Sequence, residues 1–510
     1  MLFVARGTAV GIVGRLAARL LLLVLSPVVA RIMGASGLGL IGLGITTLLV
    51  GSTIASMGIP TGIVRYLPIY LQRYGTEKAV ALAARATLAG LFLGLIAGAG
   101  LWTLAPWLAV VLRKPEATLV VRVIAFAMPF GVLRLSLSAI AIARHNAVYQ
   151  NLSDITRLCV TFLFVIVGAW FLHLGLHGAI WGIAFGEIAA VIPALIGVPR
   201  VLGISIRVFL HSLRQAINLG EFIFFSFTVA LIQLTQLGIY HINLVLGARW
   251  LDHTNLGIYT ATAELATAAT VGLVAVGDIF RPSAAALHDR QATKEMESVF
   301  HGATRWVYYL TMPALVFMFV RAEDLLSIFG PDFRMGVLAL RILCLGQIIN
   351  AGTGNVGHLL VMAGYQWLNL FDNTAMMMLN VALCLGLAPS LGIVGVAVAA
   401  SVATAMVNLL RAAQVYWYLH VSPFHWDAFK VFLAACIGAL ALLVPIDGLA
   451  LRLASGALLY AVAFLLALWL LSPPAEDKII LRQFLARKKT PSQSVPEAPQ
   501  PSQPDAEARN

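Results

Sequence analysis

Residues 151–154 of this chain read Asn-Leu-Ser-Asp, and residues 369–372 read Asn-Leu-Phe-Asp, 218 positions further on. A second pair of motifs keeps the same spacing, because Leu-Gly-Leu at 38–40 corresponds to Leu-Gly-Ile at 256–258. One such match would mean little, but several at one offset indicate an internal duplication. We therefore expect a fold made of two similar halves.

The correspondence extends outward from these motifs. Leu-Gly-Leu-His-Gly at 174–178 matches Leu-Gly-Ile-Val-Gly at 391–395, with one residue lost in the second copy. The basic segment 65–78 likewise matches the basic segment 281–294. The offset thus stays close to 217 over most of the chain.

The composition excludes a water-soluble globule, because 60% of the 510 residues are hydrophobic and only 11% are charged. A membrane-spanning helix needs about 20 mostly apolar residues. The chain contains about fourteen such runs, and two of them, 38–60 and 82–111, are separated by a basic stretch that we assign to a loop. We predict an all-α polytopic membrane protein with two six-helix lobes and two additional C-terminal helices.

The repeat and the apolar runs together predict the domain organisation. We expect an N-terminal six-helix lobe at 1–200, a cytoplasmic linker at 201–216, a C-terminal six-helix lobe at 217–420 and two further helices at 421–472. Residues 473–510 are rich in Pro, Ser, Gln and Glu, which predicts a largely disordered cytoplasmic tail. A duplicated bundle in a bilayer is typical of carriers that rock two halves around a central site.

Basic residues predict the orientation, since short loops rich in Lys and Arg stay in the cytoplasm. The more basic set of loops includes both ends of the chain, so both termini are expected on the cytoplasmic side. The net charge of +12 is explained by this bias and by affinity for anionic lipid, without nucleic-acid binding. Because six spans return the chain to its starting side, the two copies should be related by an axis along the membrane normal.

Arg15 and Arg19 in the first span are the first candidate substrate-binding residues. Four residues of helix place both side chains on one face, about 6 Å apart along the axis. Arginine stays charged and its planar fork binds phosphate oxygens in pairs, so this pair would suit a diphosphate. The alternative is that both side chains extend to the cytoplasmic headgroups.

A polar stripe marks the seventh span, the repeat counterpart of the first. Gln233, Gln236, Tyr240 and Asn243 follow at steps of three, four and three residues, which places them on one helical face. Such a stripe predicts either the wall of a polar cavity that binds the substrate or hydrogen bonding between packed helices.

Thr260, Glu264 and Thr267 share a face of the eighth span. A carboxyl group at membrane depth can have a raised pKa and exchange its charge, so Glu264 is the candidate for ion coupling. The alternative is a neutral or salt-bridged packing residue. Asp154 and Asp372, at equivalent positions of the repeat, are instead expected to cap helix starts.

Motifs of soluble enzymes are missing from the sequence, which contains no GxxxxGK[ST], HExxH or GxSxG. We therefore expect a transporter and not an enzyme, with no catalytic residue, no cofactor and no metal ligand. The single cysteines also lack the paired spacing of a zinc site.

Short motifs in order along the chain resemble the polysaccharide-transporter branch of the multidrug/oligosaccharidyl-lipid/polysaccharide (MOP) exporter superfamily, the O-antigen and exopolysaccharide repeat-unit flippases. They are Ala-Arg-Ile-Met-Gly-Ala-Ser-Gly-Leu-Gly at 30–39, Leu-Gly-Ile-Tyr at 256–259 and Leu-Gly-Ile-Val-Gly at 391–395. The resemblance extends over nearly all of residues 1–472.

The resemblance implies an inner-membrane carrier that moves an undecaprenyl-diphosphate-linked oligosaccharide to the periplasmic leaflet by alternating access. Its two lobes would enclose a cationic cavity for the diphosphate and glycan. Expected partners are this polyprenyl-diphosphate-linked glycan, membrane lipids, and a polysaccharide polymerase with other assembly proteins.

Three other functions are compatible with parts of the sequence. A drug or cation antiporter of the same superfamily would favour a carboxylate-lined cavity over one lined by arginine. A lipid II flippase would carry the same kind of polyprenyl diphosphate. A membrane-embedded glycan polymerase or ligase would need a substantial periplasmic loop, and the outside loops here are short.

Overall fold

The computed structural model describes residues 2–471 except 145, 172–173, 216, 218, 278–279, 281–292 and 423. For residues 2–20, 169–171, 236, 238–240 and 293 it describes the backbone but not the side chains. Every regular element in this described part is a helix, as predicted.

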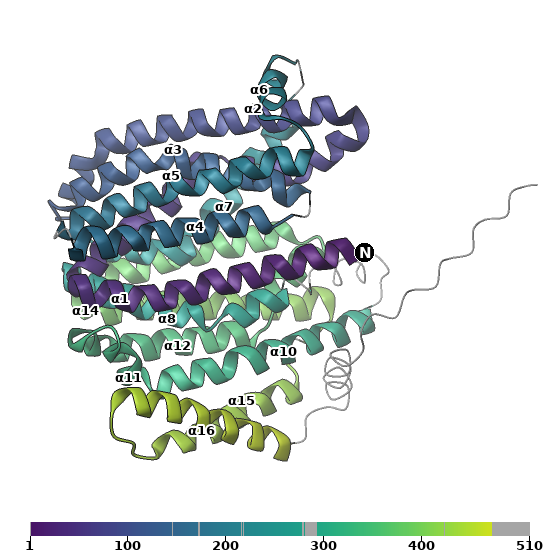
Figure 1. Ribbon diagram of the computed structural model, residues 1–510. Coiled ribbons are helices and arrows are strands. Elements are labelled where there is room, and N and C mark those ends of the chain that lie inside the picture. Colours follow the sequence, from purple (N-terminus) through teal and green to yellow (C-terminus); the bar gives the residue numbers. More distant parts are fainter. Residues whose placement is uncertain are drawn as a thin grey trace, which may run out of the picture.

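The helices form one elongated bundle (Figure 1). Those of the first half are α1 (Leu2–Ala55), α2 (Ile59–Val111), α3 (Ala117–Ala143), α4 (Val148–Phe164) with the π-helical η1 (Val165–Phe171), and α5 (Gly175–Leu202). The predicted linker contains the short α6 (Ile206–His211), followed by η2 (Ser212–Arg214).

Those of the second half are α7 (Gly220–Gly247), α8 (His253–Ala268), α10 (Thr293–Val320), α11 (Ala322–Ser327), η3 (Pro331–Gly336), α12 (Val337–Gly352), α13 (Val356–Met362) and α14 (Gln366–Leu419). The described part of the chain ends in α15 (Trp426–Gly438), η4 (Ala439–Leu443) and α16 (Leu449–Leu470), which pack on each other and on α10. We call α1–α5 the N lobe and α7–α14 the C lobe.

The double-length helix α1 reverses its direction at Gly34. This residue has φ 71° and ψ −179°, a conformation that glycine adopts without steric cost. Ser26, before the reversal, bonds Glu264 of α8, and Gly42, after it, packs against Thr260 one turn away on the same helix. The two halves of α1 therefore lie beside the same stretch of α8.

Similar reversals occur in α2 at Gly75 (φ 80°) and in α14 at Gly392 (φ 57°). In α2 the chain returns so that Gly90 lies against Ile59. The prediction of a loop between 60 and 82 was wrong, because residues 59–74 and 76–111 are helical on either side of Gly75. Basic residues did not end the helix there, since exposed arginine and lysine favour helix as well as loop.

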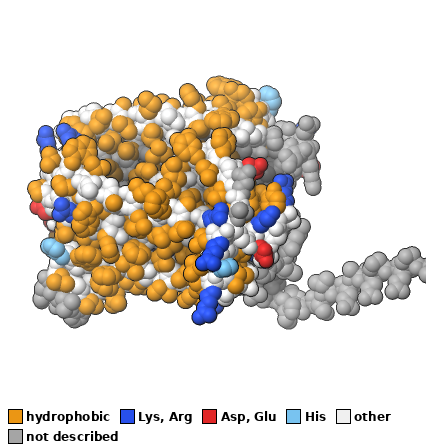
Figure 2. Space-filling model, turned by 90° about the horizontal axis from the view of Figure 1, so that it is seen from above, with side chains coloured by type: hydrophobic (Ala, Val, Ile, Leu, Met, Phe, Trp, Pro, Cys, Tyr) orange, Lys and Arg blue, Asp and Glu red, His pale blue; other side chains and the backbone are white. Residues whose placement is uncertain are grey.

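The described helices have the length and composition of a multi-pass membrane protein. Ten are long and apolar enough to cross a bilayer, or eleven if residues 253–268 and 271–277, bent by 42°, count as one span. The expected number of fourteen remains a prediction. Figure 2 shows hydrophobic side chains covering the middle of one face, with most charged side chains toward its two ends.

One end of the bundle lies opposite the N-terminus (Figure 1). It contains the reversal at Gly34 and the loops at 112–116 and 248–252. We call it the distal end. A hydrophobic core runs continuously through both lobes near it, and includes Leu40 and Ile41 of α1 with Leu256 and Ile258 of α8.

Candidate functional site between the lobes

Polar side chains connect the lobes within the membrane-spanning region, where α1 faces α8. Ser26 Oγ donates a hydrogen bond to Glu264 Oε2. Ser26 is buried, and Glu264 is half-buried. Thr260, one turn away on α8, packs against Gly42, so the predicted face of Thr260 and Glu264 does lie against the other lobe. A carboxylate at this depth is costly unless it is hydrogen-bonded or exposed to water.

A second polar contact connects the lobes where α2 faces α7. Gln233 Nε2 donates to Thr61 Oγ1 at 3.2 Å. Nearby, Gly58 and Gly62 allow α2 to approach Ser226 of α7 closely. Gln233 therefore makes the interhelical hydrogen bond that was one of the two alternatives for the polar stripe.

The rest of the stripe is only partly described. Asn243 is buried, and its Oδ1 has no hydrogen-bond partner within the described part of the chain. The side chains of Gln236 and Tyr240 lie outside the described residues, as do those of Arg15 and Arg19. The substrate-binding role of this set stays a prediction.

The sequence spacing still relates the two arginines to the lobe interface. Arg19 precedes Ser26 by seven residues and Arg15 precedes it by eleven, and both spacings return to the same face of an α-helix. That face is the one on which Ser26 meets Glu264.

A buried ionic network lies inside the N lobe, between α3, α4 and α5. Arg134 contacts Asp154 Oδ1 through Nη1 at 2.8 Å and Glu187 Oε2 through Nε at 2.9 Å. Arg157 Nε lies 3.7 Å from Glu187 Oε1. Only 4% of the Glu187 side chain is exposed, so its charge depends on these arginines.

The expectation that Asp154 caps a helix was wrong. The N-cap of α4 is Ala147, and Asp154 lies in the second turn, where it bonds Arg134 of α3. A lone carboxylate near a helix start resembles a cap in sequence, whereas its true partner is 20 residues away. The available signal was the presence of Arg134 and Glu187 within apolar spans.

Asp372, the repeat counterpart of Asp154, is likewise not a cap. It lies in the second turn of α14 and is fully buried. Gln414 Nε2 donates to its Oδ1 at 2.9 Å, while Arg411 Nε is 4.0 Å from its Oδ2. Arg411 directs Nη2 to Asn373 Oδ1 at 2.5 Å.

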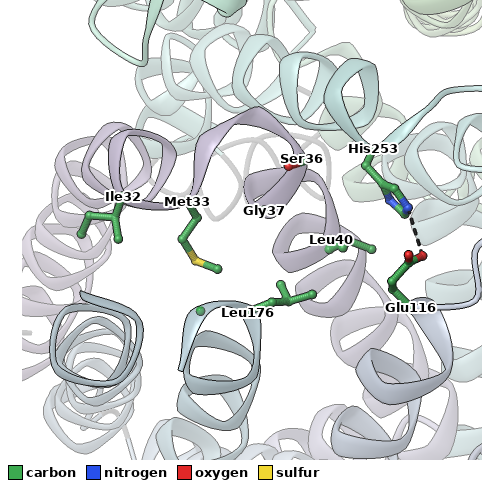
Figure 3. Close-up of a pocket in the computed structure, with 9 residues that line it drawn as sticks. Ile32, Met33, Ser36, Gly37, Leu40, Glu116, Leu176 and His253 are labelled. Atoms are coloured by element: carbon green, nitrogen blue, oxygen red, sulfur yellow. Dashed lines mark hydrogen bonds and ion pairs between the residues drawn. The ribbon is translucent and has the colours of Figure 1, made fainter. Parts of the chain in front are cut away.

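A pocket of about 310 Å³ opens at the distal end between the lobes (Figure 3). Its lining residues are Ile32, Met33, Ser36, Gly37, Leu40, Glu116, Gly175, Leu176 and His253. His253 Nε2 of the C lobe lies 3.3 Å from Glu116 Oε2 of the N lobe across it. A hydrogen bond from its own backbone amide, with a smaller contribution from His253, lowers the pKa of Glu116 below its ordinary value. None of the nine lining residues is Lys or Arg, so the pocket does not supply the permanent cations that a diphosphate needs.

Solved structures with the same fold are transporters. A lipid II flippase, MurJ, in an inward closed conformation matches with a TM-score of 0.71 and 13% identity, over 93% of this chain and 99% of that one. An inward-facing multidrug resistance MATE transporter of the MOP superfamily matches with a TM-score of 0.64 and 14% identity, over 79% and 98%. A MOP superfamily transporter from Pyrococcus furiosus matches at 0.58 and 14%, over 82% and 95%.

The sequence comparisons identify the family. No curated protein sequence matches the chain. Residues 28–332 match the family described as "Polysaccharide biosynthesis protein". The matched segment covers more than half of the chain and includes the Gly42–Thr260 contact of α1 with α8 and the Thr61–Gln233 contact of α2 with α7. This chain is a member of the polysaccharide biosynthesis protein family, built on the fold of MOP superfamily transporters.

Proposed function

We propose that this protein is a flippase that moves an undecaprenyl-diphosphate-linked oligosaccharide across the bacterial inner membrane by alternating access. The observation that carries the proposal is the polar interface between α1 and α8 in a chain of this family. Both termini would lie in the cytoplasm, so the distal end would face the periplasm. Lipids and the polymerase of the glycan would be its partners there.

The chemistry of the cargo explains the need for such an interface. A diphosphate cannot enter hydrocarbon without a very large desolvation cost. Arg15 and Arg19 would offset that cost, because their spacing places them on the face of α1 that carries Ser26 toward the C lobe. Gln236, Tyr240 and Asn243 would contribute hydrogen bonds to the glycan.

The ionic network of the N lobe supports this choice of arginines. Arg134 and Arg157 are matched by Asp154 and Glu187, so the four side chains have no net charge. Cations committed to carboxylates leave little attraction for a phosphate. The diphosphate would therefore depend on arginines outside this network, of which Arg15 and Arg19 are the best placed.

Glu264 favours a second candidate function, a drug or cation antiporter. Its carboxylate accepts a hydrogen bond from Ser26 across the lobe interface, so a proton or cation bound there would change how the lobes are joined. The likeness to a multidrug MATE transporter agrees with this reading, and the likeness to a lipid II flippase agrees with a peptidoglycan precursor as cargo. In the flippase reading, Glu264 would couple transport to an ion.

The experiment is to measure lipid-linked oligosaccharides by mass spectrometry in cells that lack the protein. These cells are then complemented, at matched protein abundance, with the wild type, an Arg15→Gln Arg19→Gln double variant or an Arg334→Gln control. Arg334 pairs with Glu323 of its own lobe at 3.8 Å, so the control removes an exposed arginine whose ionic partner is in the same lobe.

We expect an undecaprenyl-diphosphate glycan to accumulate and to be cleared by the wild type and the control only. An unchanged pool in the deletion strain would contradict the flippase proposal and favour the antiporter. Clearance by the double variant would contradict the arginine site while leaving the flippase proposal intact. Death of the deletion strain would point to the lipid II flippase.

A further inference from the structure

Two arginines join the lobes at the distal end. Arg31 of the N lobe donates from Nε to the carbonyl oxygen of Ile328 at 2.7 Å and from Nη2 to that of Ser327 at 3.3 Å. Arg249 of the C lobe donates from Nη1 to the carbonyl oxygen of Val111 at 2.8 Å. Each arginine therefore reaches from its own lobe to the backbone of the other.

These two contacts are one contact made twice by the duplicated halves. Arg31 and Arg249 are 218 positions apart, and each follows an alanine. Their acceptors, Val111 and Ile328, are 217 positions apart, which is the offset of the repeat in that region. Equivalent donors thus meet equivalent acceptors in the two directions, as in a two-fold interface.

A reciprocal glycine contact accompanies the two arginines, and each glycine follows the arginine of its own lobe by eight positions. A Cβ on Gly39 would meet the carbonyl oxygen of His253 at 2.5 Å and the amide nitrogen of Gly257 at 2.7 Å. A Cβ on Gly257 would overlap the carbonyl oxygen of Ala35. Because Ala35 and His253 are also 218 positions apart, the local two-fold axis passes between Gly39 and Gly257. Only glycine permits this approach of two backbones.

We infer that Arg31 and Arg249 form a symmetric clasp that holds the distal end closed and must be released for that end to open. The inference rests on the alternating access of the proposed function. The arginines are positioning residues, since they bind backbone carbonyls and not the cargo. Both are exposed, so water can replace either acceptor when the lobes part.

One further contact adds to the clasp without having a repeat counterpart. Lys114 Nζ, which is buried, donates to the carbonyl oxygen of Leu251 at 2.8 Å. The position 217 residues later is Pro331, which has no side-chain donor. Lys114 is therefore an asymmetric addition to the contacts made by the two arginines and the two glycines.

The test uses Thr260→Cys as a reporter of opening, in a protein whose four native cysteines are replaced by alanine. Thr260 is buried against Gly42 in the closed interface, and cysteine has a similar size. A membrane-impermeant thiosulfonate reagent is applied from the distal side to protein in its native membrane, and the labelling rate is measured. No cargo is added, so the result does not depend on which lipid is transported.

We expect about tenfold faster labelling with Arg31→Gln, a similar increase with Arg249→Gln, and a larger one with both. Arg334→Gln should label as slowly as the parent. Arg31→Lys and Arg249→Lys keep a charged donor on a long side chain, whereas glutamine is neutral and shorter, so the lysine variants should fall between, which separates clasp release from misfolding. Unchanged labelling in both glutamine variants would overturn the clasp, and a change in only one would overturn its symmetry.

Discussion

Asp154 and Asp372 occupy equivalent positions in the two lobes, but they bind different partners. In the N lobe Asp154 bonds Arg134, which also holds Glu187, so its surroundings are fully ionic. In the C lobe Asp372 accepts from the amide of Gln414, and the nearest arginine nitrogen is 4.0 Å away. The duplicated backbone and carboxylate remained, while the partners came to lie on different helices. Two residues at equivalent positions of the repeat can therefore contribute differently to the stability of their lobes.

At the distal end, by contrast, the two copies of the repeat make equivalent contacts. Arg31 and Arg249 bond equivalent carbonyls, and Gly39 and Gly257 contact each other across a local axis. The two arginine contacts and the glycine contact thus kept equivalent partners in both copies, whereas the partners of Asp154 and Asp372 inside the lobes differ.

The largest expected effect comes from breaking the ionic network of the N lobe. Arg134→Met would leave Glu187 and Asp154 without their shared cation, and removing one member of a buried ion pair costs about 3–5 kcal/mol. We expect a large loss of thermal stability in detergent, or loss of the folded protein. Arg334→Gln, which affects an exposed pair, should leave the stability unchanged.

A combined variant sharpens this prediction. Arg134→Met with Glu187→Met and Asp154→Asn removes both carboxylate charges, and Arg157, whose side chain is 25% exposed, can then be solvated, so most of the stability should return. If the single and the triple variants were equally unstable, packing and not charge would explain the role of Arg134.

The next effect concerns the symmetric interface, where the two copies should respond alike. Gly39→Ala and Gly257→Ala each place a methyl group against the backbone of the other lobe, which costs about 1–3 kcal/mol in a close-packed contact. We expect both to favour opening of the distal end, measured as faster labelling of Thr260→Cys. Clearly different rates for the two variants would contradict a local two-fold axis.

The smallest effect is expected in the C lobe. Asp372→Asn keeps an acceptor for Gln414 and removes a charge whose nearest arginine nitrogen, Arg411 Nε, is 4.0 Å away, so stability should change by about 1 kcal/mol or less. Asp154→Asn should cost more, because Arg134 lies 2.8 Å from its carboxylate. Equal melting temperatures for these two variants would show that the lobes do not differ in this respect.

Sequence alone predicted the helical class and the duplication, because composition and a constant offset are properties of the whole chain. It did not predict that α2 is helical on both sides of Gly75, because basic residues are compatible with a helix as well as with a loop. The ionic network of Asp154 was missed because Arg134, its partner, and Glu187, the second carboxylate bound by Arg134, are 20 and 33 residues away from it. The repeat offset relates Arg31 to Arg249, but their backbone acceptors in the other lobe have no side-chain signal in the sequence.

The most direct test of the proposed function is a transport measurement with the purified protein in liposomes. A polyprenyl-diphosphate oligosaccharide with a fluorescent sugar is included, and a glycosidase added outside reports how much glycan is exposed. We predict that the wild type makes the glycan of both leaflets accessible, whereas the Arg15→Gln Arg19→Gln variant exposes only the outer-leaflet share. If the wild type exposed no more glycan than protein-free liposomes, the protein would not be a flippase for this class of lipid.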